Sequence, residues 1–214
     1  RMDRALPSAH LAADPGRLKE SNNTTHFSLI DADGNMVSAT LTVNLPYGSA
    51  FAAPGTGVLL NNEMDDFSAK AAEPNAYGLI GFEANSIEPG KRMLSSMSPT
   101  IIMGPERLAI LGTPGGSRII TMVILGILDF LEGNGPESWV SLPRFHHQYL
   151  PDEISAERDA LTDEQITALE ERGHKVSVRD RPWGNMHAVM WDRVTDTLSA
   201  AHDPRLESGG AEVR

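Results

Sequence analysis

A β-hairpin near the beginning of the ordered region constrains the fold of this 214-residue chain more than any other stretch. Residues 32–35, Ala-Asp-Gly-Asn, carry the Asp-Gly pair of a tight hairpin turn, and two strand-like runs flank them at 27–31 and 36–44. In the second run Val37, Ala39, Leu41 and Val43 alternate with Ser38, Thr40, Thr42 and Asn44. Because strand side chains alternate between two faces, we expect Thr42 and Asn44 to project from the same face.

The rest of the chain mixes predicted strands with predicted helices. We predict a short strand at 58–61, a hairpin of strands 98–103 and 107–113, a strand from about residue 175, and a last hairpin of strands 186–192 and 198–202. A buried helix is predicted over 118–132. A second begins at a capping box of Thr162 and Gln165 and ends before Gly173. Residues 68–92 are rich in Ala, Pro and Gly and indicate a long loop. Strands in hairpins together with helices predict the α+β class.

Charge and composition exclude several kinds of site and partner. The net charge of −11 disfavours nucleic acid and anionic membrane surfaces, which bind basic patches. The absence of cysteine excludes disulfides, thiolate metal sites and a cysteine nucleophile. The most apolar run, residues 119–131, is shorter than the ~20 residues of a membrane span, so we expect no such span in this chain. Residues 1–23 are polar and irregular, carry a net charge of +1, and indicate a tail or linker that ends where order begins at Thr24.

Four short segments combine residue types suited to chemistry. They are Asn-Thr-Thr-His-Phe at 23–27, the acidic segment 61–67, the serine-rich segment 94–100 and the glycine-rich turn 112–118. Taken singly, each has a plain structural interpretation as a strand entry, a solvated turn, a loop or a tight strand-to-helix connection. The glycine turn lacks the spacing of a phosphate-binding loop. Neighbouring His146 and His147 point opposite ways on an extended chain and have no third ligand at metal-site spacing, so we expect a structural role and no metal.

Together and in this order, the segments resemble the small subunit of the gamma-glutamyltranspeptidase family over roughly residues 20–205. The resemblance rests on Thr24-Thr25-His26, on 61–67, on Leu94-Ser95-Ser96-Met97, on Pro114-Gly115-Gly116 and on 143–147. It implies a precursor that cuts itself before Thr24. Residues 1–23 then correspond to the carboxy-terminal end of the large subunit, and 24–214 to the small catalytic subunit. The implied fold is the four-layer αββα sandwich of N-terminal-nucleophile hydrolases, completed by the large subunit.

The resemblance also implies a role for each site residue. Thr24 is the nucleophile and Thr42 the threonine whose hydroxyl bonds to it, while Gly115 and Gly116 form the oxyanion hole. Asn44, Glu63 and Asp66 are the residues that the resemblance implies bind the α-amino group of the substrate. The α-carboxylate falls to Ser95 and Ser96, with an arginine of the large subunit, and Tyr77 is the aromatic residue of a lid loop.

The chemistry of a terminal threonine can be argued independently of any family. A hydroxyl is a weak nucleophile that needs a neighbouring base. A free α-amine has a reference pKa of about 7.7–8.0, against about 10.4 for lysine, so it can be neutral near physiological pH and accept the hydroxyl proton. Before cleavage that nitrogen belongs to an amide and cannot serve. Cleavage before Thr24 therefore creates the base.

The expected reaction is acyl transfer. A γ-glutamyl group passes from glutathione or a related amide to Thr24, and then to water, an amino acid or a peptide, with no cofactor. The expected partner is the large subunit, and the expected location is periplasmic or secreted. Two alternatives stay open at this point: a cephalosporin or glutaryl acylase of the same architecture, and a non-catalytic, uncleaved fragment.

Overall fold

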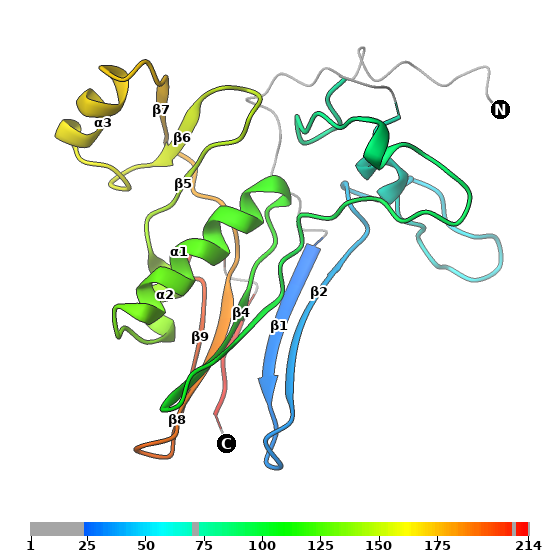
Figure 1. Cartoon of the computed structure of the whole chain (residues 1–214). Coiled ribbons are helices and arrows are strands. Elements are labelled where there is room, and N and C mark those ends of the chain that lie inside the picture. The colour runs from blue at the N-terminus through cyan, green and yellow to red at the C-terminus, as the bar shows by residue number, and fades with distance from the viewer. Residues whose placement is uncertain (1–23, 70–72, 207–208, 214) are drawn as a thin grey trace.

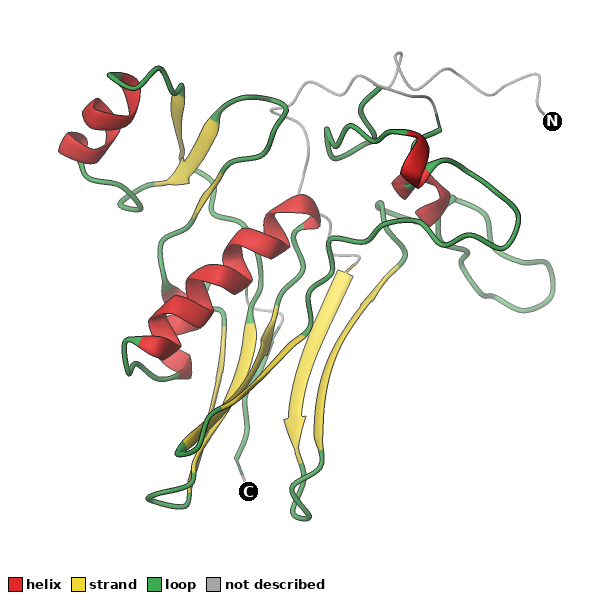
Figure 2. Cartoon of the chain, in the orientation of Figure 1, coloured by secondary structure: helices red, strands yellow, loops and turns green. Residues whose placement is uncertain are grey.

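The computed structural model describes residues 24–69, 73–206 and 209–213, which form three sheets and three α-helices (Figure 1). The predicted tail at 1–23 lies outside these residues. None of the helices in the described ranges is long and apolar enough to cross a membrane. The combination of strands and helices is plain in Figure 2.

The predicted first hairpin is confirmed as strands β1 (Thr24–Ile30) and β2 (Met36–Thr42), paired in register from Thr24↔Thr42 to Ile30↔Met36. Its turn is closed by Asp31, whose Oδ1 accepts hydrogen bonds from the backbone N–H groups of Asp33 and Asn35. Gly34 adopts φ 82°, a left-handed conformation that glycine reaches without strain.

A four-stranded antiparallel sheet forms the centre, in the order β3 (Thr100–Met103), β4 (Arg107–Gly112), β8 (His187–Asp192) and β9 (Thr197–His202). The hairpins β3–β4 and β8–β9 were predicted from the sequence. Helix α1 (Ile119–Leu131) was predicted as well. Helix α2 (Pro136–Ser141) was not. The apolar core lies between the helices and the sheet and includes Leu111, Met122, Trp139 and Met186.

The two sides of β4 show that the molecule is layered. A side chain on Gly126 of α1 would lie 2.7 Å from Leu111 Cδ1, so helix and sheet are in close contact on that face. A side chain on Gly112, the next residue, would fall 2.2 Å from the imidazole of His26 in β1. Because successive strand residues point to opposite faces, the helices cover one face of the sheet and the β1–β2 hairpin covers the other (Figure 1).

A smaller unit follows the helices. It contains β5 (Phe145–His146), β6 (Ile154–Glu157) and β7 (Val176–Arg179), and α3 (Asp163–Glu170) connects the last two. The capping box of Thr162 and Gln165 is confirmed. β6 and β7 run parallel, and neither β5, β6 nor their pairing was predicted. The predicted strand at 58–61 is wrong, since only one bridge, Ala52↔Leu59, forms there. Segment 68–92 is a loop as predicted, with isolated bridges and a turn of 3-10 helix at Glu83–Asn85 among its described residues.

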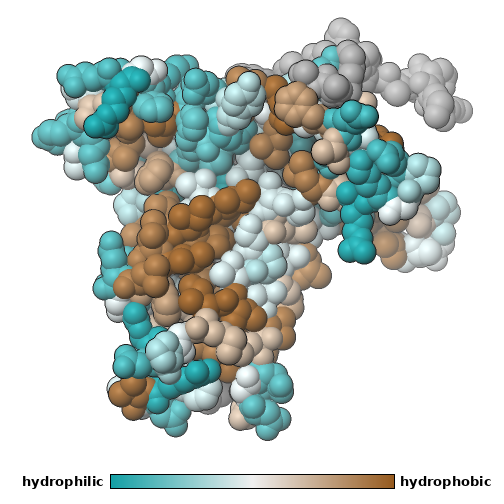
Figure 3. All heavy atoms as spheres, in the orientation of Figure 1, coloured by the Kyte–Doolittle hydropathy of each residue, from teal (hydrophilic) through white to brown (hydrophobic). Residues whose placement is uncertain are grey.

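Two apolar faces remain exposed. The outer face of the hairpin presents Phe27, Leu29, Val37 and Leu41, which are 39–53% exposed, while its polar face is the one packed on the central sheet. The outer face of α1 presents Ile120, Ile124, Leu128 and Leu131, visible as a continuous apolar surface in Figure 3. Contiguous exposed apolar faces are typical of surfaces that another polypeptide covers.

A buried ionic cluster ties the smaller unit to the end of β9. The Arg144 guanidinium donates to the Asp203 carboxylate, and Arg205 pairs with Glu157 at 2.7 Å and with Asp203 at 3.1 Å. Arg144 and Asp203 are at most 1% exposed. Removing one member of such a cluster leaves its partner charged and uncompensated inside the protein.

We therefore expect Asp203→Ala to lower the free energy of unfolding by about 3–5 kcal/mol, because Arg144 would lose its counter-ion in a buried position. The matched control is Glu88→Ala, which removes a solvent-exposed pair with Lys91 and is expected to cost much less than the buried change. Urea unfolding of both variants measures the difference. Equal losses would show that the buried cluster contributes no more than a surface pair.

Candidate active site

Thr24 and Thr42 meet at the open end of the hairpin. They form the first cross-strand pair, their side chains share the face turned toward the central sheet, and their Oγ1 atoms are 2.9 Å apart. Thr42 Oγ1 also accepts the backbone N–H of Asn44 at 2.8 Å, which orients it toward Thr24. The strand pairing therefore holds the hydroxyl of Thr24 against a second hydroxyl.

Asn44 lies near this pair for a reason different from the predicted one. Strand β2 ends at Thr42, and Asn44 adopts φ 71°, so strand alternation does not place it. A left-handed residue turns the chain sharply, and asparagine tolerates that conformation better than most side chains. Asn44 is 3% exposed, and its Nδ2 donates to the backbone carbonyl of Asn62 at 3.2 Å. The predicted strand thus ends at Thr42, two residues earlier than expected, and Asn44 reaches the site through a turn and not through strand alternation.

Tyr77 crosses the site from the long loop. Its hydroxyl donates to Asn44 Oδ1 at 2.7 Å, and its ring fills the space beside Gly116, where a Cβ would lie 2.7 Å from ring atoms. Burial, with Asp66 and other nearby carboxylates, raises the pKa of Tyr77 to about 12. The phenol is therefore neutral and acts as a donor. Tyr77 covers the junction between the hairpin and the glycine turn.

Gly115 and Gly116 connect β4 to α1 at φ 145° and 58°, both in the region that favours glycine. They lead into the 3-10 turn Gly116–Arg118. Within the described part of the chain, neither backbone N–H of these two residues has a hydrogen-bond acceptor. Two unpaired N–H groups ahead of a helix can bind an oxyanion.

An acidic turn faces Tyr77. Glu63, Asp65 and Asp66 form the 3-10 turn Glu63–Asp66, and Asp65 Oδ2 accepts the backbone N–H of Ala76 at 3.1 Å. Burial, reinforced by Glu63 and Asp65, raises the pKa of Asp66 to about 6. Carboxylates gathered in this way are stabilised by a cation placed among them. The turn thus suits an ammonium group.

Ser95 and Ser96 lie on another side of the glycine turn. They line a cavity of about 320 Å³ together with Ser117, Thr121 and His146. Ser95 Oγ accepts the backbone N–H of Met97 at 3.1 Å. Among the described residues, no hydrogen bond joins either serine to Thr24, to Asn44 or to the acidic turn. The structure therefore brings the serines to the glycine turn but not into contact with the other predicted binding residues.

His26 is a site residue for which the sequence suggested no role. It is 2% exposed, and its ring contacts Thr40 Oγ1 at 2.8 Å and Ser28 Oγ at 3.1 Å. Burial, and to a smaller extent His187, lowers the pKa of His26 to about 4, so the ring is neutral. It packs on Gly112 and lies two residues after Thr24, on the same face of β1. The polar alternation of Thr24, His26 and Ser28 is the sequence signal that could have revealed this buried face.

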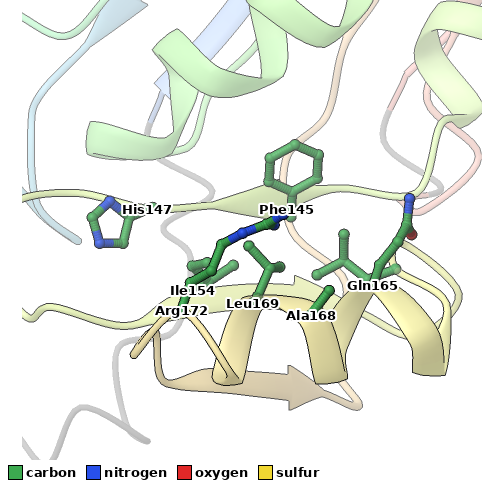
Figure 4. A pocket seen from close by; sticks show the side chains of 8 residues that line it. Phe145, His147, Ile154, Gln165, Ala168, Leu169 and Arg172 are labelled. Carbon is green, nitrogen blue, oxygen red and sulfur yellow. The ribbon is translucent and has the colours of Figure 1, made fainter.

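A second cavity, of about 350 Å³, lies between β5 and α3 and shares only His147 with the cavity lined by Ser95 and Ser96 (Figure 4). Phe145, Ile154, Leu161, Ala168 and Leu169 give it a largely apolar lining, with His147, Gln165 and Arg172. Its lining contains no serine, threonine or cysteine that could act as a nucleophile. The described residues contain no group of three His, Cys, Asp or Glu side chains arranged to hold a metal ion.

The sequence model of the gamma-glutamyltranspeptidase family matches residues 3–213. The chain is 49% identical over 200 residues to the glutathione hydrolase proenzyme of Pseudomonas sp. (strain A14), covering 89% of this chain and 35% of that protein. It is 40% identical over 215 residues to the glutathione hydrolase proenzyme of Escherichia coli K12, covering 94% and 37% respectively. The chain thus spans little more than a third of these relatives.

The chain is also similar to solved structures of this family and of a related fold. The chain superposes on a chain of gamma-glutamyltranspeptidase from Pseudomonas nitroreducens complexed with L-DON at a TM-score of 0.79 and 42% identity, covering 89% of this chain and all of that one. It also superposes on cephalosporin acylase from Bacillus halodurans at a TM-score of 0.65 and 22% identity, covering 89% of this chain and 35% of that one, a likeness of fold alone.

We expect the stability of the protein to fall between pH 6.5 and pH 4. His26 binds a proton in the unfolded chain below about 6.5 but in the folded chain only below about 4, so the unfolded state takes up more protons across this window. The linked loss is at most about 3 kcal/mol. Urea unfolding of wild type and His26→Gln at pH 7 and pH 4.5 tests it. Identical pH dependence in the two proteins would remove His26 as the source.

Proposed function

This chain belongs to the gamma-glutamyltranspeptidase family, and we propose that it is the small catalytic subunit of such an enzyme, preceded by the end of the large subunit. Thr24 would be the nucleophile of γ-glutamyl transfer from glutathione or a related amide to water, an amino acid or a peptide. The observation that carries the proposal is the 2.9 Å contact between the Oγ1 atoms of Thr24 and Thr42 at the first residue of β1.

The first step is self-cleavage. Thr24 Oγ1 attacks the carbonyl carbon of Asn23, the peptide C–N bond breaks, and the resulting ester is hydrolysed by water. The products are a carboxylate at Asn23 and a free α-amine on Thr24. That amine is the base for later turnovers, because its reference pKa of about 7.7–8.0 leaves part of it neutral near pH 7.

The length of the structural match supports a cut at this bond. A separate chain of the P. nitroreducens enzyme is covered completely by 89% of this chain, which fits a mature subunit somewhat shorter than the 214 residues. Both curated relatives named above, which are about three times as long as this chain, are called proenzymes.

In turnover, Thr24 attacks the γ-carbonyl of the substrate and its α-amine takes the hydroxyl proton. The backbone N–H groups of Gly115 and Gly116 would stabilise the oxyanion, where each such donor contributes about 3–4 kcal/mol. The amine product leaves with the proton, and an ester between Thr24 and the γ-glutamyl group remains. Water or an amine then attacks that ester and regenerates Thr24.

Substrate recognition would depend on the acidic turn. Asn44, Glu63 and Asp66 would hold the α-ammonium group, whose positive charge would favour the ionised form of Asp66. Ser95 and Ser96 would hold the α-carboxylate with an arginine of the large subunit. Tyr77, bonded to Asn44, would cover the bound group.

The large subunit would complete the fold. The helices, the central sheet and the β1–β2 hairpin supply three layers, and a fourth on the apolar outer face of the hairpin would give the αββα sandwich. The apolar face of α1 offers a second surface for the same partner. A periplasmic or secreted location is proposed from the resemblance to the bacterial enzymes.

We expect Thr24→Ala to remain uncut and inactive when expressed as the full precursor, because the variant lacks the attacking oxygen. Thr25→Ala is the matched control: Thr25 is the next residue of β1, is exposed on the opposite face, and should leave cleavage intact. Gel mobility and amino-terminal sequencing of both proteins decide the matter. An active wild type with an intact bond before Thr24 would contradict the assignment.

We expect a strong preference for γ-glutamyl-p-nitroanilide over glutaryl-p-nitroanilide, since the two acyl groups differ only by the α-ammonium. A site built to bond that amine can reject the analogue by about 10⁴–10⁵ in kcat/KM. Asp66→Asn should reduce the preference by harming the γ-glutamyl substrate, at a cost of about 3–5 kcal/mol by analogy with a broken buried ion pair. Comparable wild-type rates on both substrates would favour the acylase alternative.

The pH dependence gives this prediction a second test. Below about pH 6 the Asp66 carboxylate takes up a proton and loses the charge that attracts the ammonium. We expect kcat/KM for the γ-glutamyl substrate to fall as the pH drops through this value in the wild type. Asp66→Asn should lack that step, and its persistence in the variant would assign it to another group.

A further inference from the structure

The side-chain amide of Gln148 lies where three segments of the site meet. Its Oε1 accepts from Ser117 Oγ at 2.7 Å and contacts His146 Nε2 at 2.9 Å. Its Nε2 donates to the backbone carbonyls of Tyr77 at 3.0 Å and Leu150 at 2.6 Å. One amide therefore bonds the glycine turn, the segment that covers the site, and the chain that follows β5.

The hydrogen-bond roles in this cluster admit one assignment. Two backbone carbonyls can only accept, so the nitrogen of the Gln148 amide must face them and its oxygen must face Ser117 and His146. His146 then carries its proton on Nε2, and its Nδ1 accepts from Thr121 Oγ1 at 2.7 Å. Burial lowers the pKa of His146, which agrees with a neutral ring. Both N–H groups of the amide, and both lone pairs of its oxygen, are used.

Gln148 bonds two segments that face each other across the site, the glycine turn through Ser117 and the covering segment through Tyr77. Ser117 follows Gly116 in the turn Gly116–Arg118. Tyr77 lies on Gly116 with its ring and on Asn44 with its hydroxyl, while its carbonyl bonds Gln148. Gly78 also packs against this amide, since a side chain there would lie 3.3 Å from Gln148 Nε2. The covering segment is thus fastened on one edge to Asn44 and on the other to Gln148.

We propose that Gln148 is a positioning residue that couples the covering segment, residues 73–82, to the turn that carries Gly115 and Gly116. A fully bonded amide in a partly buried cluster makes the two segments move as one unit, because displacing either leaves a polar atom without its partner. Release of the cover and displacement of the glycine turn are then a single event. The kinetic consequence rests on the proposed function, whereas the coupling itself does not.

Two substitutions separate the bond to the turn from the bond to the covering segment. Gln148→Glu keeps an acceptor for Ser117 and His146 but loses the N–H groups that hold the carbonyls of Tyr77 and Leu150. Ser117→Ala removes the bond to the turn, and the side-chain hydrogen bond of Ser117 goes to Gln148 and not to the covering segment. The matched control is Tyr149→Ala, because Tyr149 is the next residue and is 78% exposed.

Hydrogen exchange tests the coupling. It is measured by mass spectrometry on the protein obtained by expressing the full precursor. We expect Gln148→Glu to speed exchange of residues 73–82 about tenfold, an effect of the size set by one or two hydrogen bonds. The diagnostic variant is Ser117→Ala, which should also speed exchange in 73–82, by about threefold or more, although its only change lies in the turn. Tyr149→Ala should match the wild type.

The kinetic readout uses γ-glutamyl-p-nitroanilide with and without an amino-acid acceptor. A loosened cover admits water to the acyl-enzyme, so Gln148→Glu should raise the ratio of hydrolysis to transfer and lower kcat more than it raises KM. A merely structural residue would change the amount of folded enzyme but not this ratio.

Unchanged exchange of 73–82 in Ser117→Ala would overturn the proposal, since the two segments would then be held separately. An unaltered hydrolysis-to-transfer ratio in an active Gln148→Glu would overturn its kinetic part. A wild type without γ-glutamyl activity would contradict the proposed function, and the exchange experiment would still decide the coupling.

Discussion

The contact between the imidazole of His26 and the backbone of Gly112 fixes the position of the β1–β2 hairpin on the central sheet. A side chain at Gly112 would fill the space of the ring, so the two sheets can approach only because this position has none. Ser28 and Ser38 add hydrogen bonds across the same interface, to the carbonyls of His187 and Leu111. The first residue of the hairpin is Thr24, and its hydroxyl is therefore set by packing two residues away.

The interface is unusual because its polar face is the buried one. Hydroxyls and an imidazole satisfy one another there, and a neutral His26 is the condition for that arrangement. The opposite, apolar face of the same hairpin remains open to solvent in this chain. Both facts have one explanation if the hairpin is an inner layer, with the central sheet on one side and a partner on the other.

Patterns that are local in sequence predicted much of the fold. The Asp-Gly turn, the Thr162 capping box and the apolar run of α1 each specify their own structure, and all three form as expected. The parallel pairing of β6 with β7 was missed because it joins strands separated by a helix, and the alternation within a four-residue strand does not identify its partner. The strand predicted at 58–61 failed because the apolar residues there have no neighbouring strand to pair with beyond one bridge.

The site shows the same division. A cross-strand pair placed Thr24 beside Thr42, but Asn44 depends on a left-handed residue and on Asn62, which no alternation reveals. The roles of His26 and Gln148 depend on contacts across 86 and 71 residues of sequence, to Gly112 and Tyr77, so only the folded chain shows them.

The exposed apolar faces have a consequence for assembly. If the chain is cut before Thr24 as proposed, the two parts would fold while still joined, and each would meet the other at the high effective concentration of a tethered pair. After the cut only the apolar faces and their complements hold them, and dissociation would return those faces to water. In that order of events, the covalent link would bring the two parts together, and burial of the apolar faces would hold them together after the cut.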